Sequence, residues 1–70
     1  MRRVKVLALK VARVKKELTQ EGLAKVSGVG RVTISNIERK GIKNIPVYTL
    51  EKLAKALDTT VAELFFSEEQ

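Results

Sequence analysis

The segment from Leu18 to Arg39 constrains the fold more than any other part of this 70-residue chain. It reads L-T-Q-E-G-L-A-K-V-S-G-V-G-R-V-T-I-S-N-I-E-R, with two apolar-periodic stretches on either side of a Gly-Val-Gly turn. Thr19 has the hydroxyl needed to cap a new helix, and Gly28 suits the left-handed conformation in which helices commonly end. The segment therefore predicts two short helices joined by a tight turn, a helix-turn-helix over about residues 19–39.

The second of these helices, expected from about Arg31 to Arg39, has an unusual outward face. Ile34 and Ile37 form its buried side, which turns the other early positions outward. These outward positions are Arg31, Val32, Thr33, Ser35 and Asn36. A merely solvated helix is usually filled with Glu and Lys, so small polar groups led by an arginine indicate a helix that contacts the DNA major groove.

The distribution of charge agrees with this interpretation. Residues 1–46 hold 12 of the 14 basic residues against three acidic ones, whereas residues 47–70 hold two basic and five acidic residues. A basic segment followed by an acidic one is typical of a module that binds a polyanion with one face. The alternative, that the lysines serve solubility, stays open on charge alone.

Composition excludes several other classes of protein. There is no cysteine and no histidine, so we expect no disulfide, metal site or cofactor. No paired carboxylate cluster or phosphate-cradling glycine loop indicates an enzyme. No apolar run suggests a secretory signal or a membrane span, so the sequence predicts a cytoplasmic protein with one domain over residues 1–70.

The remaining helices are predicted from periodicity. Residues 1–17 carry no helix breaker, and an apolar stripe recurs at helical spacing on Val4, Leu7, Val11 and Val14. Two further helices are expected at about residues 47–66, the second opened by a Thr60-x-x-Glu63 capping box. We expect no strand, and fraying over residues 67–70.

Taken together, the motifs resemble a known family. They are Arg13 ahead of L-T-Q-x-x-L-A-K, then G-V, I-S-N-I-E-R, T-L-E-K-L-A-K-A-L and an apolar T-V-x-E-L-F end. In this order they resemble the lambda-repressor-like DNA-binding domain, the Xre or Cro/repressor-type helix-turn-helix, over about residues 5–66. The resemblance implies an all-α fold of five helices. The stretch R-K-G-I-K-N-I-P, followed by V-Y-T-L-E-K-L-A-K-A-L, particularly resembles the controller proteins of restriction-modification systems, with stand-alone phage-type and mobile-element repressors as the alternative.

The resemblance implies roles for particular residues. The positions that match base contacts are Arg31, Val32 and Asn36. Those that match contacts to the DNA backbone or minor groove are Gln20, Thr33, Ser35, Lys40, Lys43 and Asn44. Arg31 can donate twice to guanine, Asn36 can pair with adenine, and Val32 can pack on a thymine methyl group. Arg13 and Glu38 match a partly buried structural ion pair.

Simpler interpretations stay open for several of these residues. Val32 can be an ordinary exposed valine, and Asn36 can simply be hydrated on its helix. Lys40 and Lys43 can be solvated loop charges. Gly22 and Gly30 depart from the usual helix-start residues, and Pro46 departs from the Ser or Thr common as the next cap, which leaves the cap geometry open.

The first helix departs further from the family pattern. In the family register, Leu9, Ala12 and Arg13 face the core, so the stripe that includes Val11 and Val14 would be exposed. Either this helix is rotated, or the stripe contacts another subunit, or it is scattered apolar surface of the ordinary kind.

The resulting functional hypothesis is a sequence-specific transcription regulator, a repressor or autoregulator, that binds double-stranded DNA. We expect a homodimer on a near-palindromic operator, with an interface that includes Tyr48, Phe65 and Phe66, and no small-molecule ligand. The alternative hypothesis is a protein-interaction module, such as an antitoxin or adaptor, with weak DNA binding.

Overall fold

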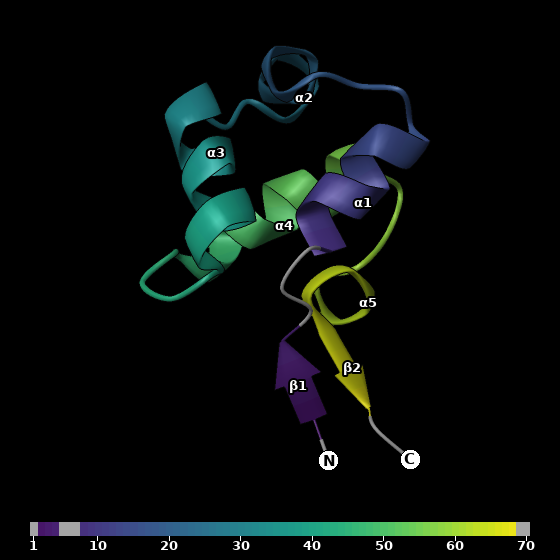
Figure 1. The fold of residues 1–70 in the computed structure, drawn as a ribbon, viewed down its shortest axis with the longest axis vertical. Helices are drawn as coiled ribbons and strands as arrows, with labels where there is room; N and C mark the ends of the chain where they lie inside the picture. Colours follow the sequence, from purple (N-terminus) through teal and green to yellow (C-terminus); the bar gives the residue numbers. More distant parts are fainter. Residues whose placement is uncertain (1, 5–7, 69–70) are drawn as a thin grey trace.

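The computed structural model describes residues 2–4 and 8–68, with side chains described for residues 8–66. Within these residues the chain forms five helices and a pair of short strands (Figure 1). In chain order they are β1 Arg2–Val4, α1 Ala8–Lys15, α2 Gln20–Ser27, α3 Arg31–Lys40, α4 Val47–Ala56, α5 Val61–Phe65 and β2 Phe66–Glu68. The predicted five-helix order is confirmed.

Helix α2 begins and ends where its sequence signals predict. The Thr19 hydroxyl accepts a hydrogen bond from the Gly22 N–H at 2.9 Å, which caps the start of the helix. At the other end Gly28 is left-handed, with φ of 76°, and its N–H donates to the Ala24 carbonyl. Val29, in the turn between α2 and α3, is buried. This turn therefore fixes the angle between the two helices with one apolar side chain.

Helices α4 and α5 also match the sequence pattern. α4 follows Pro46, which supplies no side-chain cap. The Thr60 hydroxyl accepts from the Glu63 N–H at 3.1 Å, so the predicted cap at the start of α5 is present. α4 contacts α2 and α5, while α1 contacts α3 and α5. The helices thus surround one apolar core.

The core consists of buried side chains from all five helices and from the turns between them. They are Leu9, Leu23, Val29, Ile34, Ile37, Leu50, Leu53, Ala54, Leu57, Leu64 and Phe65. Leu9 comes from α1, whose Val11 and Val14 are 48% and 55% exposed. Helix α1 is therefore in the family register, and the described part of the predicted stripe lies at the surface.

Two expectations about the chain ends are wrong. Residues 2–4 form a strand rather than the start of a helix, and β1 pairs antiparallel with β2, Val4 opposite Phe66 (Figure 1). Ser67 and Glu68 are part of β2 and so do not fray. The β-branched Val4 favours an extended backbone once a partner strand is present. Leu7, which belongs to the predicted apolar stripe, and residues 69–70, for which fraying was expected, lie outside the described residues.

Candidate nucleic-acid interface

Helix α3 presents to solvent the side chains that the sequence predicts as base contacts. Ile34 and Ile37 are buried at 0% and 2% exposure, which fixes how the helix is rotated on the core. Arg31 and Val32 are therefore exposed, Val32 by 72% of its surface. Thr33, Ser35 and Asn36 are partly exposed. The five predicted side chains thus lie on the outer side of one helix, near its N-terminal end.

The start of α3 differs from the start of α2. Gly30 occupies the cap position with an extended backbone and no side-chain cap. A Cβ at this position would meet nothing within 4 Å, so no neighbour requires a glycine there. At Gly22, by contrast, a Cβ would lie 3.3 Å from the Thr19 hydroxyl oxygen. A side chain at position 22 would therefore lie in close contact with the capping hydroxyl, but the cap itself does not require glycine, because Glu63 occupies the equivalent position in the cap of α5.

The ion pair between Arg13 and Glu38 joins α1 to α3. Arg13 Nε donates to Glu38 Oε2 at 2.7 Å, and Arg13 Nη2 donates to Glu38 Oε1 at 3.1 Å. The same guanidinium donates through Nη1 to the Leu18 carbonyl at 2.8 Å. The two charged side chains are only 12% and 5% exposed. This bidentate pair, implied by the family resemblance, fixes the start of α2 relative to α3.

Gln20 belongs to the same network. Its Nε2 donates to Glu38 Oε1 at 3.0 Å. Burial raises the pKa of Glu38, but the hydrogen bonds from Arg13 and Gln20 and the positive charges of Arg13 and Lys10 together outweigh burial, so the net pKa lies below the ordinary glutamate value. The hydrogen bond to Glu38 raises the pKa of Arg13, so the pair is fully charged at neutral pH. The predicted phosphate contact, Gln20, is therefore held in place by a charged carboxylate.

A polar hollow lies where α2 begins beside α3. Its lining residues are Arg13, Thr19, Gln20, Glu21 and Arg31. The first-turn N–H groups of α2 supply partial positive charge here, and Arg31 adds a full charge, whereas the charge of Arg13 is already paired with Glu38. This combination can bind an anionic oxygen, although the carboxylate of Glu21, which also lines the hollow, works against it.

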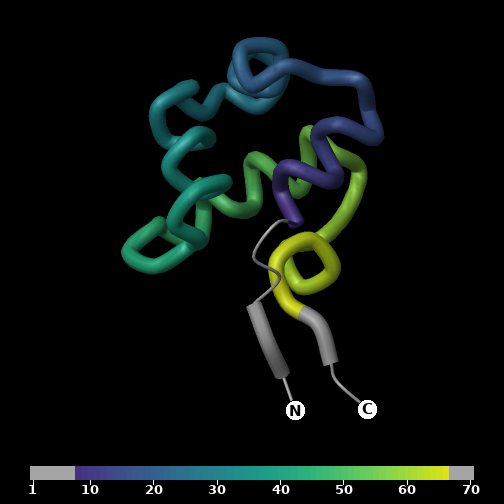
Figure 2. Tube along the Cα trace, viewed as in Figure 1, coloured from purple at the N-terminus to yellow at the C-terminus, as the bar shows by residue number. Residues whose placement is uncertain are grey.

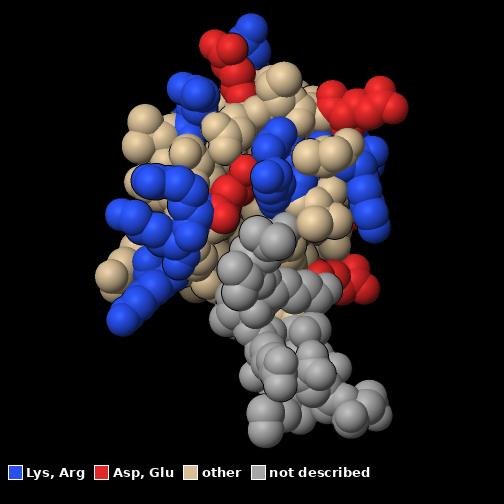
Figure 3. All heavy atoms as spheres, viewed as in Figure 1, with Lys and Arg blue, Asp and Glu red and all other residues tan. Residues whose placement is uncertain are grey.

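The loop after α3 carries the remaining predicted contacts. Gly41 ends the helix with φ of 91°, and Asn44 is left-handed with φ of 67°. Lys40, Lys43 and Asn44 are all exposed. Lys and Arg side chains gather over the end of α3 and this loop, which projects from the helices in the Cα trace (Figures 2 and 3). The structure thus places the basic loop on the molecule next to the outer side of α3.

The three residues expected at a dimer interface do not share one environment. Tyr48 is 61% exposed, with the Lys52 ammonium 4.9 Å from its ring centroid. Phe66 is partly buried against the core. Phe65 is 1% exposed, so the core already occupies its ring. The expectation that Phe65 contacts a second subunit is therefore wrong, because its ring is enclosed by the core of its own chain.

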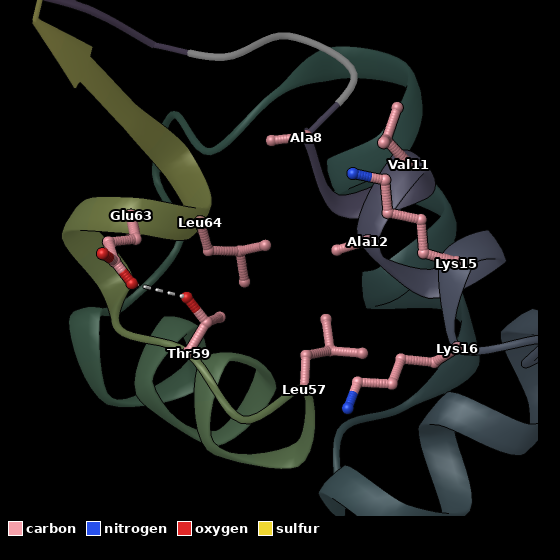
Figure 4. Close-up of a pocket in the computed structure, with 9 residues that line it drawn as sticks. All are labelled: Ala8, Val11, Ala12, Lys15, Lys16, Leu57, Thr59, Glu63 and Leu64. Carbon is pink, nitrogen blue, oxygen red and sulfur yellow. Dashed lines mark hydrogen bonds between the residues drawn. The ribbon is translucent and has the colours of Figure 1, made fainter.

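A second hollow lies on another part of the surface, between α1 and α5 (Figure 4). Its lining residues are Ala8, Val11, Ala12, Lys15, Lys16, Leu57, Thr59, Glu63 and Leu64. None of them belongs to α2 or α3. Ala12, Leu57 and Leu64 point into the hollow from its two sides. It is therefore more apolar than the hollow beside α2 and separate from the predicted contact residues.

Two contacts at the candidate interface were not foreseen in the sequence. One is the hydrogen bond from Gln20 to Glu38. The other runs along α3, where Arg39 Nη2 donates to Asn36 Oδ1 at 2.9 Å. The second contact could have been predicted, because residues three apart on a helix lie on the same side. The first could not, because it depends on the angle between α2 and α3.

Among the described residues, no acidic, cysteine or histidine cluster could hold a metal ion, and no helix is long and apolar enough to cross a membrane.

Comparisons with known proteins agree with this geometry. A family model described as helix-turn-helix matches residues 9–64. Control protein C.SmaI of Serratia marcescens is 49% identical over 47 residues, which cover 67% of this chain and 55% of that protein. The chain thus spans little more than half the length of that relative. The crystal structure of the hypothetical transcription factor NHTF from Neisseria matches with a TM-score of 0.73 and 39% identity, over 84% of this chain and 69% of that one.

Proposed function

The chain belongs to the helix-turn-helix family whose model spans residues 9–64, and from this premise we propose that it is a sequence-specific DNA-binding transcription regulator. Family membership confirms the resemblance inferred from the sequence motifs. The observation that carries the proposal is the outer side of α3, where Arg31, Val32 and Asn36 are available to a ligand while Ile34 and Ile37 anchor the helix.

In the proposed complex, the N-terminal half of α3 enters the major groove. Arg31 donates two hydrogen bonds to guanine O6 and N7, which is a common specific contact in protein–DNA complexes. Val32, at 72% exposure, packs on a thymine methyl group, which removes apolar surface of both partners from water. Asn36 meets a base at the next turn of the helix. These three side chains supply sequence discrimination.

Contacts to the sugar-phosphate backbone position the helix. We assign these to Gln20, Thr33, Ser35, Lys40, Lys43 and Asn44. Gln20 uses one amide N–H for Glu38, which leaves its second N–H for a phosphate oxygen at the start of α2. The exposed Lys40 and Lys43 supply the charge that makes affinity depend on salt.

A single recognition helix reads only a few base pairs, so we propose that the protein binds as a homodimer. Two α3 helices about one DNA turn apart, roughly 34 Å, would read a near-palindromic operator. The candidate interface contains Tyr48, which is exposed, and Phe66, which is partly buried. The similarity to control protein C.SmaI, which extends over 47 residues, supports a repressor, autoregulator or controller role. We propose that residues 1–70 act in this role as a single domain.

The interface residues can be tested by self-association. Phe66→Ala removes an aromatic ring at the proposed subunit contact, so dimer and DNA affinity should fall together in sedimentation equilibrium and binding assays. Tyr48→Ala serves as a second variant, because this ring is more exposed and its loss leaves the core intact. Unchanged sedimentation of both variants, with native circular dichroism, would place the subunit contact elsewhere.

The proposed function can be tested by fluorescence anisotropy. The protein is titrated onto DNA from upstream of its own gene and onto a scrambled duplex of equal length, across roughly 50 to 300 mM salt. Arg31→Ala should cost about 1–3 kcal/mol of binding free energy on the native fragment only. Lys55→Ala, which removes an equal charge from an exposed site on α4, is the matched control.

The second candidate function is a protein-interaction module, such as an antitoxin or adaptor. The observation that favours it is the apolar hollow between α1 and α5 (Figure 4). If the chain binds neither duplex at any salt concentration, this function takes first place. If it binds both duplexes equally and with steep salt dependence, the protein is a basic DNA binder without preference for that fragment.

A further inference from the structure

Arg39, near the end of α3, extends back along the helix to Asn36. Its Nη2 donates to Asn36 Oδ1 at 2.9 Å. Residues three apart on a helix lie on the same side, so the contact needs no distortion of α3. Within residues 8–66, whose side chains are described, neither residue forms another side-chain hydrogen bond or ion pair.

This hydrogen bond fixes which way the Asn36 amide points. The two ends of a carboxamide have similar shape and opposite chemistry, an acceptor oxygen and a donor NH₂ group. A guanidinium has donors only, so Arg39 can bind the oxygen and not the nitrogen. With Oδ1 held against Arg39, the Nδ2 group is the end without a partner in the described residues.

We propose that Arg39 is a positioning residue for base specificity, acting through the orientation of the Asn36 amide. This inference rests on the proposed function, since it requires that Asn36 meets a base. With Arg39 in place, Asn36 offers donors, which match acceptors such as purine N7, guanine O6 and thymine O4. Cytosine presents only its N4 amino donor in the major groove and is therefore rejected.

Loss of Arg39 frees the amide to rotate. Oδ1 can then turn toward DNA and accept a hydrogen bond from cytosine N4, so discrimination against cytosine falls. The expected change is roughly threefold to tenfold at that one position, because solvent weakens an exposed charge-assisted hydrogen bond. Arg31, at the other end of the contact surface, does not touch Arg39, so the preference at its base is unchanged.

A selection experiment from random-sequence DNA tests this and requires no identified operator. The wild-type chain, Asn36→Ala and Arg39→Met are each used to select bound duplexes. The selected sequences are aligned, and the base frequencies in each column of the alignment, which is one position of the binding site, are compared between the proteins. The column that Asn36→Ala randomises is the one read by Asn36. In that column, Arg39→Met should recover cytosine more often than the wild type does, and in an Asn36→Ala background it should change nothing further.

A neighbouring cation provides the control for charge. Lys40→Ala removes one exposed positive charge from the next residue, so it should lower affinity for all sequences and leave base frequencies unchanged. If Arg39→Met behaves in the same way, with a weaker dependence of DNA affinity on salt concentration and unchanged base frequencies at every position, Arg39 is a phosphate contact and the inference is overturned. If the wild type selects no motif at all, the proposed function fails first, and the inference fails with it.

Discussion

Two ion pairs connect α1 and the residues just beyond it to other parts of the chain, and they differ in nearly every physical respect. Arg13 in α1 pairs with Glu38 in α3 at 2.7 Å, with side chains 12% and 5% exposed. Lys16, one residue beyond α1, pairs with Asp58 between α4 and α5 at 3.2 Å, with side chains 47% and 82% exposed. The first pair lies beside the candidate interface, and Lys16 lines the hollow between α1 and α5 (Figure 4).

The difference shows how burial decides what an ion pair contributes. Solvent screens the exposed pair, and its attraction is largely offset by ordering two long side chains. The Arg13–Glu38 pair has two parallel hydrogen bonds and a further donor in Gln20. Removing one of its partners leaves a charge with little access to water. The buried polar network therefore fixes α1 against α3, whereas the exposed pair of Lys16 and Asp58 adds little to the position of α1.

The largest effect is expected for Glu38→Ala. It leaves the Arg13 guanidinium partly buried without its carboxylate, which should cost about 2–4 kcal/mol of unfolding free energy. Urea denaturation should show this as a lower midpoint with an unchanged slope. Glu51→Ala, at an exposed glutamate of α4, is the matched control and should be nearly neutral. If the free energy of unfolding falls by less than about 0.5 kcal/mol, which is the size expected for a surface pair, the two ion pairs do not differ in what they contribute to stability.

The second expected effect is a dependence on pH. Because the pKa of folded Glu38 is lowered, its stabilisation is complete above the unfolded glutamate pKa of about 4.3 and is lost as pH falls through the folded value. The stability gap between wild type and Glu38→Gln should therefore shrink from about pH 6 to about pH 3. Thermal unfolding at a series of pH values measures this gap. A gap that stays constant or widens on acidification contradicts the assigned pKa direction.

The smallest effect is expected for Lys16→Ala. This substitution breaks a single exposed contact, so the unfolding free energy should change by less than about 0.5 kcal/mol. A double-mutant cycle with Asp58→Ala, followed by urea denaturation, isolates the coupling between the two side chains. A coupling comparable to that of Arg13 and Glu38 would show that exposure does not separate the two pairs.

Local signals in the sequence located most of the helices. Thr19 and Gly28 bound α2, and Thr60 caps α5, because each acts on backbone groups within four residues of itself. The start of the chain was misassigned because Val4 pairs with Phe66, a partner more than 60 residues away. Helical periodicity in residues 1–17 carries no information about such a distant strand.

The sequence predicted which residues make up the candidate site better than it predicted the contacts between them. The burial of Ile34 and Ile37 follows from helical spacing, so the outward position of Arg31 and Val32 could be predicted. The hydrogen bond from Gln20 to Glu38 depends on the angle between α2 and α3, which no local pattern specifies. Phe65 is buried in the core and Phe66 is only partly buried against it. This difference arises where a helix changes to a strand, a boundary that periodicity does not locate.

The most direct test of the central claim maps the proposed DNA-binding face residue by residue. The ¹⁵N-labelled protein is titrated with a duplex selected from random DNA, and amide chemical shifts are followed by NMR. The account predicts the largest changes at the start of α2, along the outer side of α3 and in the loop of residues 41–46. Changes centred instead on Val11, Lys15 and Leu64, around the hollow between α1 and α5, would contradict it.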